Sequence, residues 1–330
     1  MNYSKLLQKH TKLLAVIQSD FPIEQRPFRE TAELIGWTES EVIMTVHTLI
    51  KNGTIRTFGP VFDARKLGYV STLVAAEVKN ERITELAALM DDIDEITHNY
   101  LRDYNLNMWF TITAGSEDIM GNIFALIERF SGVSRILNLP ALKVYKIKAV
   151  FGAAKTASLT PKESTEYQPL DDKEKHIIRR IQDGFPIVEK PFKLVAEQMG
   201  IDESVILDTV KYWLKTGVIR RFGARLNHHN AGYTANSMIA WKSGDIDKLG
   251  QTFAALPYVS HCYRRQSYSD WPFELYTMVH AKSESELDKL LSEMKLLAPK
   301  ADMKAFNTIR ELKKKAMKYF LKDDRWDTQK

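Results

Sequence analysis

The chain has 330 residues, 44% of them hydrophobic and 10% aromatic, which predicts a globular protein of about two domains or more. A single cysteine, Cys262, excludes an internal disulfide framework and any cysteine-rich zinc or iron–sulfur site. The net charge is +5, but the segment from Arg310 to Lys330, with eight basic and four acidic residues, carries +4 of it. The rest of the chain is therefore nearly neutral, and its charge does not by itself indicate a nucleic-acid partner.

The N-terminal segment shows no pattern of a signal peptide or membrane anchor. Lys5, Lys9, His10 and Lys12 interrupt the apolar residues of the first twenty positions, and no later segment is apolar for the length that a bilayer requires. We therefore expect a cytoplasmic protein that does not contact a membrane.

The chain consists of two copies of one module. Residues 17–23 (IQSDFPI) recur at 181–187 (IQDGFPI), and residues 53–59 (GTIRTFG) recur at 217–223 (GVIRRFG). Both pairs are separated by the same offset of 164 residues. Chance similarity would not keep a constant spacing, so the sequence indicates a tandem duplication.

Each copy begins with a predicted winged helix-turn-helix. In the first copy, helical spacing of apolar residues predicts a helix over 3–19, and a second helix lies between Pro27 and Gly36. Thr38 starts a third helix through a capping box. The buried face of this third helix is predicted to consist of Val42, Val46, Leu49 and Ile50. Residues 55–62 then predict a pair of short strands, the wing.

The second part of each copy has a β-α-β-β-α-β pattern, which predicts a ferredoxin-like sandwich with both helices on one face of the sheet. In the first copy the predicted strands are 69–78, 93–102, 105–114 and 142–150, with helices at 83–90 and 119–130. In the second copy they are 233–241, 258–265, 274–281 and 303–308, with helices at 246–255 and 284–297.

The predicted fold class is therefore α+β, a tandem duplication of a winged helix-turn-helix plus a ferredoxin-like βαββαβ domain. The predicted units are 1–66 and 171–230 (winged helix-turn-helix), 67–152 and 231–310 (ferredoxin-like), a linker at 153–170, and a basic C-terminal helix or tail at 311–330.

This architecture resembles the Lrp/AsnC transcriptional regulators over nearly the whole chain, which makes DNA binding in response to a small ligand or haem the alternative function. The third helices argue against it. Their first turns carry acids, Glu39 and Glu41 in one copy and Asp202 and Glu203 in the other, where phosphates require cations. The wings do carry basic residues, namely Arg56, Arg65, Lys66, Arg220, Arg221 and Arg225. We consider a nucleic-acid partner the weaker interpretation.

A polar hairpin in the first ferredoxin-like domain predicts a ligand site. Side chains alternate between the two faces of a strand, so His98, Tyr100 and Arg102 share one face. On the return strand, Leu106, Met108, Phe110 and Ile112 form an apolar row that suits the helix-covered face. Asn105, Asn107 and Trp109 then point toward the face of the histidine. Burying so polar a face against ordinary core is costly, and it is typical of a pocket wall.

The second copy repeats the first half of this hairpin. His261, Tyr263 and Arg265 preserve the His-Tyr-Arg spacing, and Arg264 and Trp271 follow in a longer and different turn. Cys262 alternates away from this face, and we expect it to be packed in the core. The pattern leaves open whether both copies or only one copy holds a working pocket.

These residues resemble the siroheme decarboxylases. The run from His98 to Phe110 (HNYLRDYNLNMWF) resembles one of their subunit types, and the run from His261 to His280 resembles the partner type. The chain thus resembles a fusion of both types over essentially all 330 residues. The resemblance implies a carboxy-lyase that removes the carboxylates of two acetate side chains of siroheme, giving didecarboxysiroheme for d-type haem or alternative haem biosynthesis.

The residues suit that chemistry. Arginines clamp carboxylates, and we expect Arg102, Arg264 and Arg265 to do so here. Asn105, Asn107, Trp109 and Trp271 are the other predicted substrate-binding residues. The carbon that loses carbon dioxide must accept a proton, for which the catalytic candidates are His98, Tyr100, His261 and Tyr263. His98 or His261 could instead ligate the substrate iron, and the sequence leaves both roles open.

No cofactor is expected beyond the iron tetrapyrrole itself. The expected partners are siroheme and didecarboxysiroheme. For the assembly we expect either a monomer whose two copies pair internally about a pseudo-two-fold axis or a homodimer.

Overall fold

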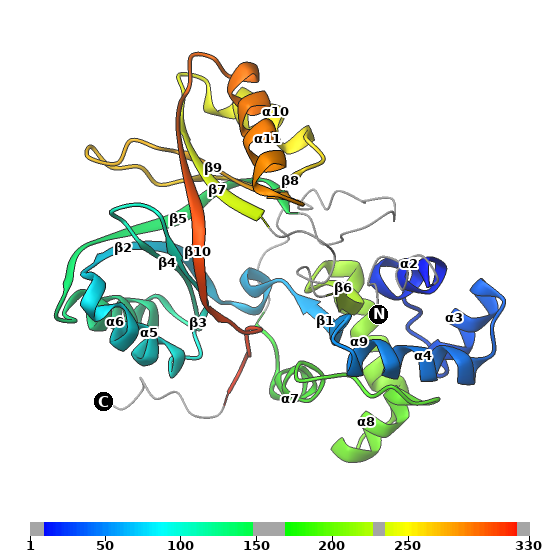
Figure 1. Cartoon of the computed structure of the whole chain (residues 1–330). Helices are drawn as coiled ribbons and strands as arrows, with labels where there is room; N and C mark the ends of the chain where they lie inside the picture. Colours follow the sequence, from blue (N-terminus) through cyan, green and yellow to red (C-terminus); the bar gives the residue numbers. More distant parts are fainter. Residues whose placement is uncertain (1–9, 148–168, 227–234, 322–330) are drawn as a thin grey trace.

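The computed structural model describes residues 10–147, 169–226 and 235–321 (Figure 1). The first copy contains α2 (Thr11–Ser19), α3 (Pro27–Ile35), α4 (Glu39–Lys51), β1 (Ile55–Phe62), β2 (Val70–Val78), α5 (Ile83–Asp91), β3 (Ile96–Arg102), β4 (Met108–Ala114), α6 (Glu117–Glu128) and β5 (Val133–Ile147). The second copy contains α7 (Asp172–Ile181), α8 (Pro191–Met199), α9 (Glu203–Thr216), β6 (Ile219–Leu226), β7 (Ala235–Lys242), α10 (Ile246–Ala255), β8 (Val259–Arg265), β9 (Leu275–Ala281), α11 (Glu284–Leu297) and β10 (Asp302–Lys314). This confirms the α+β tandem duplication.

The two ferredoxin-like sheets join into one closed barrel with the strand order β10-β3-β4-β2-β5-β8-β9-β7. The last strand of each copy is long enough to leave its own sheet and pair with the other one: β5 pairs with β2 and then β8, and β10 pairs with β7 and then β3. Figure 1 shows β10 passing from the second sheet to the first. Each sheet thereby covers the open edge of its partner, so neither sheet keeps an unpaired edge at these two seams.

As far as the structure describes them, the wings do not form hairpins within each copy, and this prediction was wrong. β1 is one continuous strand that pairs in antiparallel fashion with β6 of the other copy, with Gly59 opposite Gly223. Each wing strand also packs on the first helix of the other copy, because Gly223 lies against Ile17 and Gly59 lies against Ile181. The duplication supplies a second wing strand as partner. Its backbone N–H and C=O groups form the hydrogen bonds that a second strand of the same wing would form in a hairpin.

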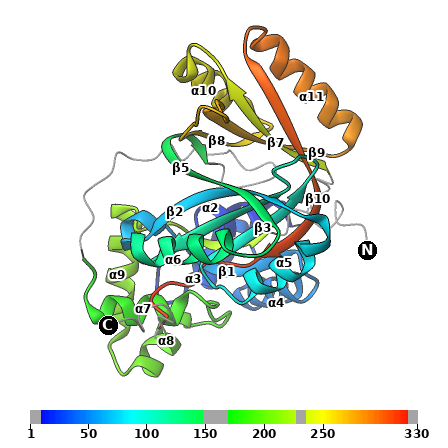
Figure 2. The same ribbon diagram turned by 90° about the vertical axis from the view of Figure 1, so that its left-hand side faces the viewer.

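The two helix-turn-helix units share one hydrophobic core and lie together on one side of the barrel (Figure 2). Separate cores lie between each sheet and its own two helices. A fourth apolar cluster fills the inside of the barrel, and we call it the barrel core. It consists of Ala75, Leu106, Trp109, Leu137, Leu139, Met238, Ala240, Trp271, Tyr276 and Phe306.

Several local predictions are confirmed and others need correction. The capping box of Thr38 and Glu41 is present at the start of α4. In the buried face of this helix, Val42, Val46 and Leu49 are buried as predicted, but Ile50 is 36% exposed. The strand predicted at 142–150 begins nine residues earlier, at Val133, because the whole stretch from there pairs with β2 before it reaches β8.

Of the predicted basic C-terminal helix or tail, the helix is wrong where the structure describes the segment. Residues Glu311 to Lys314 form the end of β10, and residues 315–321 continue without a helix. The buried Lys313 ammonium donates to three carbonyls at the end of α5, those of Met90, Asp91 and Ile93. Pairing with β3 and these hydrogen bonds outweigh the helix-favouring composition of the segment. Most of the predicted linker and residues 322–330 lie outside the described residues.

Within the described ranges, we find no helix that has both the length and the hydropathy of a membrane span.

Candidate active site

Two matching rows of side chains lie on the barrel strands next to the seams. We call His98, Tyr100 and Arg102 on β3 half-site one, and His261, Tyr263 and Arg265 on β8 half-site two. In both rows the intervening residues face the helices, since Asn99 reaches Met90 and Cys262 lies in the core beneath α10. The predicted sharing of one face is therefore confirmed in each copy. Because β3 and β8 are four strands apart in the eight-stranded order, the half-sites lie on opposite sides of the barrel.

The histidines and tyrosines are held in the same way in both half-sites. Each imidazole Nδ1 lies against the hydroxyl of the preceding residue, at 2.9 Å from Thr97 in half-site one and 3.0 Å from Ser260 in half-site two. The rings of His98 and Tyr100 stack with centroids 6.4 Å apart, and the rings of His261 and Tyr263 stack at 6.0 Å. In half-site one this contact leaves the His98 Nε2 as the atom that can meet a substrate.

Each arginine reaches across its seam. Arg102 Nη1 donates to the Phe306 carbonyl at 2.8 Å, and Arg265 Nη1 donates to the Leu139 carbonyl at 2.7 Å. Both guanidinium groups lie over the tyrosine of their own row, 5.4 Å and 4.9 Å from the ring centroids. The Nε of each arginine is buried without a hydrogen-bond partner, and burial lowers the pKa of Arg102 to about 10. A charged group buried with a donor unused is costly, which is typical of a site that is completed by an anion.

The wings bring further cations to the half-sites. Arg56 of β1 lies near half-site one, and Arg65 and Arg220 lie near half-site two. Burial lowers the pKa of His98 to about 4, with the charges of Lys314 and Arg56 acting in the same direction and Glu311 opposing them. Burial also raises the pKa of Tyr100 to about 12. At neutral pH, His98 is therefore an uncharged imidazole and Tyr100 an uncharged phenol.

The cations at half-site two are already paired. The Asp63 carboxylate lies 3.1 Å from both Arg65 and Arg220. Although burial opposes its ionisation, the hydrogen bond from Arg65 and the charges of Arg220 and Arg65 together lower the pKa of Asp63. The residue 164 positions further along is Asn227, which carries no charge. The repeat therefore places an acid only in the wing that serves half-site two.

The two predicted tryptophans lie inside the barrel, and Trp109 is directly opposite Tyr100 across the β3–β4 pair, which confirms its predicted place on the face of half-site one. Trp109 and Trp271 lie in the barrel core at 1% and 3% exposure, with Trp109 donating to the Leu106 carbonyl and Trp271 to the Tyr276 hydroxyl. Leu106 belongs to this same core, so its predicted place on the helix-covered face was wrong, because the chain before Met108 is a turn and not a strand. The substrate contacts of both tryptophans stay predictions.

The other three residues have different surroundings. Asn107 exchanges two hydrogen bonds with the backbone of Val78, which holds the turn to the end of β2. Asn105 is exposed in that turn. Arg264 faces away from half-site two and pairs with Glu274 at 2.8 Å and Asp247 at 3.8 Å, so its predicted place on the substrate-facing side was wrong. The outward orientation of Arg264 follows from strand alternation, since its neighbour Arg265 occupies the inner face.

Sequence reasoning missed two contributors to half-site one. Arg56 appeared only as a basic wing residue, and Glu311 only as part of the tail. Both come close to His98 because β1 and β10 cross between copies. The constant repeat offset signalled internal pairing, but it could not reveal which strands would cross.

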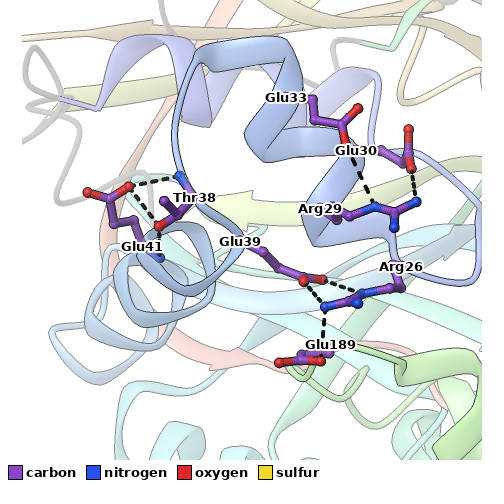
Figure 3. Close-up of polar contacts among 8 residues, drawn as sticks. All are labelled: Arg26, Arg29, Glu30, Glu33, Thr38, Glu39, Glu41 and Glu189. Atoms are coloured by element: carbon purple, nitrogen blue, oxygen red, sulfur yellow. Dashed lines mark hydrogen bonds and ion pairs between the residues drawn. The ribbon is translucent and has the colours of Figure 1, made fainter.

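The helix-turn-helix units are tied to each other through the ends of their helices. Arg26 pairs with Glu39 at the start of α4 and with Glu189 of the other copy, the latter at 3.0 Å (Figure 3). His47 of α4 lies 2.9 Å from the Ile187 carbonyl, and Lys211, its repeat counterpart, pairs with Glu24. The third helices thus contact the neighbouring copy, and their first turns remain acidic. This arrangement does not favour contact with DNA phosphates.

Comparison with known families identifies both parts of each copy. Residues 66–146 and 230–313 match the AsnC-like ligand binding domain, and residues 10–56 and 174–220 match the siroheme decarboxylase NirDL-like HTH domain. The matches appear twice, as the duplication requires.

Individual relatives agree with these matches. A siroheme decarboxylase of Hydrogenobacter thermophilus is 33% identical over 96% of both chains. The siroheme decarboxylase beta subunit of Methanosarcina barkeri is 37% identical and covers 44% of this chain and 97% of its own length. The crystal structure of the siroheme decarboxylase NirDL in complex with an iron-uroporphyrin III analogue superposes with a TM-score of 0.78 at 28% identity, covering 96% of this chain and 97% of that one. The chain belongs to the siroheme decarboxylase family.

Proposed function

We propose that the chain removes the carboxyl groups of two acetate side chains of siroheme as carbon dioxide and so gives didecarboxysiroheme, which makes it a carboxy-lyase. The observation that supports this most is the duplicated His-Tyr-Arg row, with wing arginines beside each row, in a chain of this family. Siroheme is a flat macrocycle bearing several carboxylates. Arginines that keep an unused buried donor suit such a polyanion.

The reaction requires one proton for each carboxylate lost. When the bond between the acetate methylene and its carboxyl carbon breaks, carbon dioxide leaves and the electron pair remains on the methylene, where the ring delocalises it. The methylene then takes a proton and becomes a methyl group. We assign this proton to His98 or His261, with Tyr100 or Tyr263 assisting, and water restores the proton to the histidine.

The protonation state of His98 links binding to this step. With a pKa of about 4, its imidazole is neutral before the substrate arrives. Carboxylates placed beside it favour the charged form and raise the pKa, so the substrate itself promotes protonation. We therefore expect proton uptake on binding. The same Nε2, left available by the Thr97 contact, could instead ligate the substrate iron, and proton uptake distinguishes the two roles.

We propose that no cofactor is needed beyond the tetrapyrrole, because its conjugated ring accepts the electron pair of the broken bond. The two copies already pair through the barrel and the wings, which supports internal pairing within one chain. Whether two such chains form a homodimer, and the cytoplasmic location, stay predictions. We propose no nucleic-acid partner, since the contact of α4 with the other copy through His47 and the acidic first turn of this helix disfavour one.

The direct test is anaerobic incubation of the full chain with siroheme, followed by mass spectrometry of the tetrapyrrole. We expect the mass to fall by two carbon dioxide molecules, through a species that has lost one. The matched control replaces both His98 and His261 with alanine, and we expect it to bind siroheme without releasing carbon dioxide. Unchanged siroheme with the wild-type chain, or full turnover by the double variant, would contradict the proposal or its histidine assignment respectively.

A further inference from the structure

The two half-sites differ on the neighbouring strand that faces each tyrosine. β10 pairs with β3 so that Glu311 lies opposite Tyr100. At the other seam, β5 pairs with β8 so that Val144 lies opposite Tyr263. Directly opposite residues of an antiparallel pair lie within side-chain reach of each other. Half-site one therefore has a carboxylate at a position where half-site two has an aliphatic side chain.

The same difference recurs beside the histidines. Lys314 lies opposite His98, whereas Ile147 lies opposite His261. Within half-site one, Lys314 Nζ lies 3.1 Å from a carboxylate oxygen of Glu311. This ion pair offsets the charge of Glu311, so the acid can remain beside a site for a polyanionic substrate.

Glu311 makes a specific contact with the catalytic row. Its carboxylate lies opposite the phenol across the β10–β3 pair, within reach to accept a hydrogen bond from the Tyr100 hydroxyl, and burial and this carboxylate both raise the pKa of Tyr100. The Tyr100 ring in turn stacks on His98, and the Arg102 guanidinium covers it. Fixing the hydroxyl fixes the ring torsion, and a fixed ring restricts the imidazole that packs on it. Val144 has no atom that could accept a hydrogen bond from Tyr263.

We propose that Glu311 is a positioning residue that holds Tyr100 against His98, and that this makes half-site one the half that delivers the proton in decarboxylation. The inference rests on the proposed function and adds to it a division of labour between the copies. Glu311 acts through Tyr100 and does not itself meet the substrate. Half-site two keeps the same row but lacks this support, and its wing arginines are partly neutralised by Asp63.

The test compares three variants of the full chain: Glu311→Ala, Glu311→Gln and the matched truncation Val144→Ala in half-site two. Turnover is followed by mass spectrometry, and affinity by the absorbance change on titration with siroheme. We expect Glu311→Ala to lower kcat about ten-fold while KM and Kd change by less than about two-fold. Glu311→Gln keeps an oxygen acceptor for the Tyr100 hydroxyl and should recover most of the lost kcat. Val144→Ala should stay within about two-fold of the wild type.

A second comparison checks that Glu311 acts through the tyrosine. The double variant Tyr100→Phe/Glu311→Ala should be no slower than Tyr100→Phe, because the phenylalanine has no hydroxyl left to position. Equal slowing by Glu311→Gln and Glu311→Ala, additive losses in the double variant, or an equal loss in Val144→Ala would each overturn the inference. Wild-type turnover with unaffected Glu311→Ala refutes the positioning role alone, whereas a wild-type chain that leaves siroheme unchanged refutes the proposed function itself.

Discussion

The two copies of the module have kept the same backbone and the same His-Tyr-Arg row, but the surroundings of the row have diverged. At half-site one, an acid and a base of β10 face the row, and in the part of the chain that the structure describes Arg56 has no carboxylate within ion-pair distance. At half-site two, aliphatic side chains of β5 lie opposite the row, and Asp63 forms ion pairs with the wing residues Arg65 and Arg220. An internal duplication can therefore conserve the residues of a site while changing the charges around them.

The glycines at the centre of the wing ribbon should give the largest difference between the copies. Gly59 and Gly223 both have a positive φ near 143°, which strains any other residue. At Gly223 an added Cβ would also collide with the rigid Ile17 carbonyl of α2, whereas at Gly59 the nearest atom, the Ile181 carbonyl oxygen, is 3.4 Å away. We expect Gly223→Ala to cost about 3–5 kcal/mol and Gly59→Ala about 1–2 kcal/mol. Urea unfolding of both variants measures the loss in free energy of unfolding. Equal losses would contradict the predicted difference and show that α2 shifts to accommodate the added Cβ at Gly223.

These glycines also show what the sequence could predict about the fold. The repeat offset of 164 and the periodicity of apolar residues predicted the duplication, the element types and most strand bounds. They could not show that each wing pairs with the other wing. Strand alternation specifies which face of a strand is buried, but not which other strand pairs with its edge. The same limit explains the C-terminal error, since Lys313 and its neighbours are strand residues only because β3 offers them an edge.

Replacing each histidine separately should give the next largest effect. His98→Ala removes the proton donor of the half-site that Glu311 supports, and we expect kcat to fall at least 100-fold. His261→Ala should lower kcat less than ten-fold, because half-site two lacks that support. Product analysis by mass spectrometry should show whether either variant accumulates the singly decarboxylated species. Equal losses would mean that each half-site removes one carboxylate.

Among the site residues, those that share one strand were predictable and those that come from crossing strands were not. His98, Tyr100 and Arg102 follow from a period of two along β3, and the same period assigns Arg265 inward. The same period places Arg264 on the outer face, so the sequence already contained the information that corrects its predicted substrate contact. Glu311 and Arg56 reach half-site one through β10 and β1, whose pairing no local pattern encodes.

Removing the acid of half-site two should have a smaller and pH-dependent effect. Asp63 is buried, and its pKa is lowered in the folded chain, so its ion pairs stabilise the fold above the unfolded pKa of about 3.9. We expect Asp63→Asn to cost about 1–2 kcal/mol at neutral pH. This cost should shrink as the pH falls through the lowered pKa, where the wild-type carboxyl also becomes neutral. Denaturant unfolding at several pH values provides the measurement, and a cost independent of pH would contradict the assignment.

The smallest expected effect compares the wing arginines, Arg56 of half-site one and its repeat counterpart Arg220 of half-site two. Arg56 is exposed, whereas the charge of Arg220 is already offset by Asp63 at 3.1 Å. An unpaired cation beside a site attracts a polyanion more strongly than a paired one, and salt screens that attraction. Arg56→Gln should therefore weaken siroheme binding about five-fold at low salt and much less at high salt, and Arg220→Gln should weaken it less than about two-fold at either. Absorbance titrations at two salt concentrations test this. A larger loss of affinity in Arg220→Gln than in Arg56→Gln would contradict the prediction and indicate that half-site two attracts the substrate despite its paired charges.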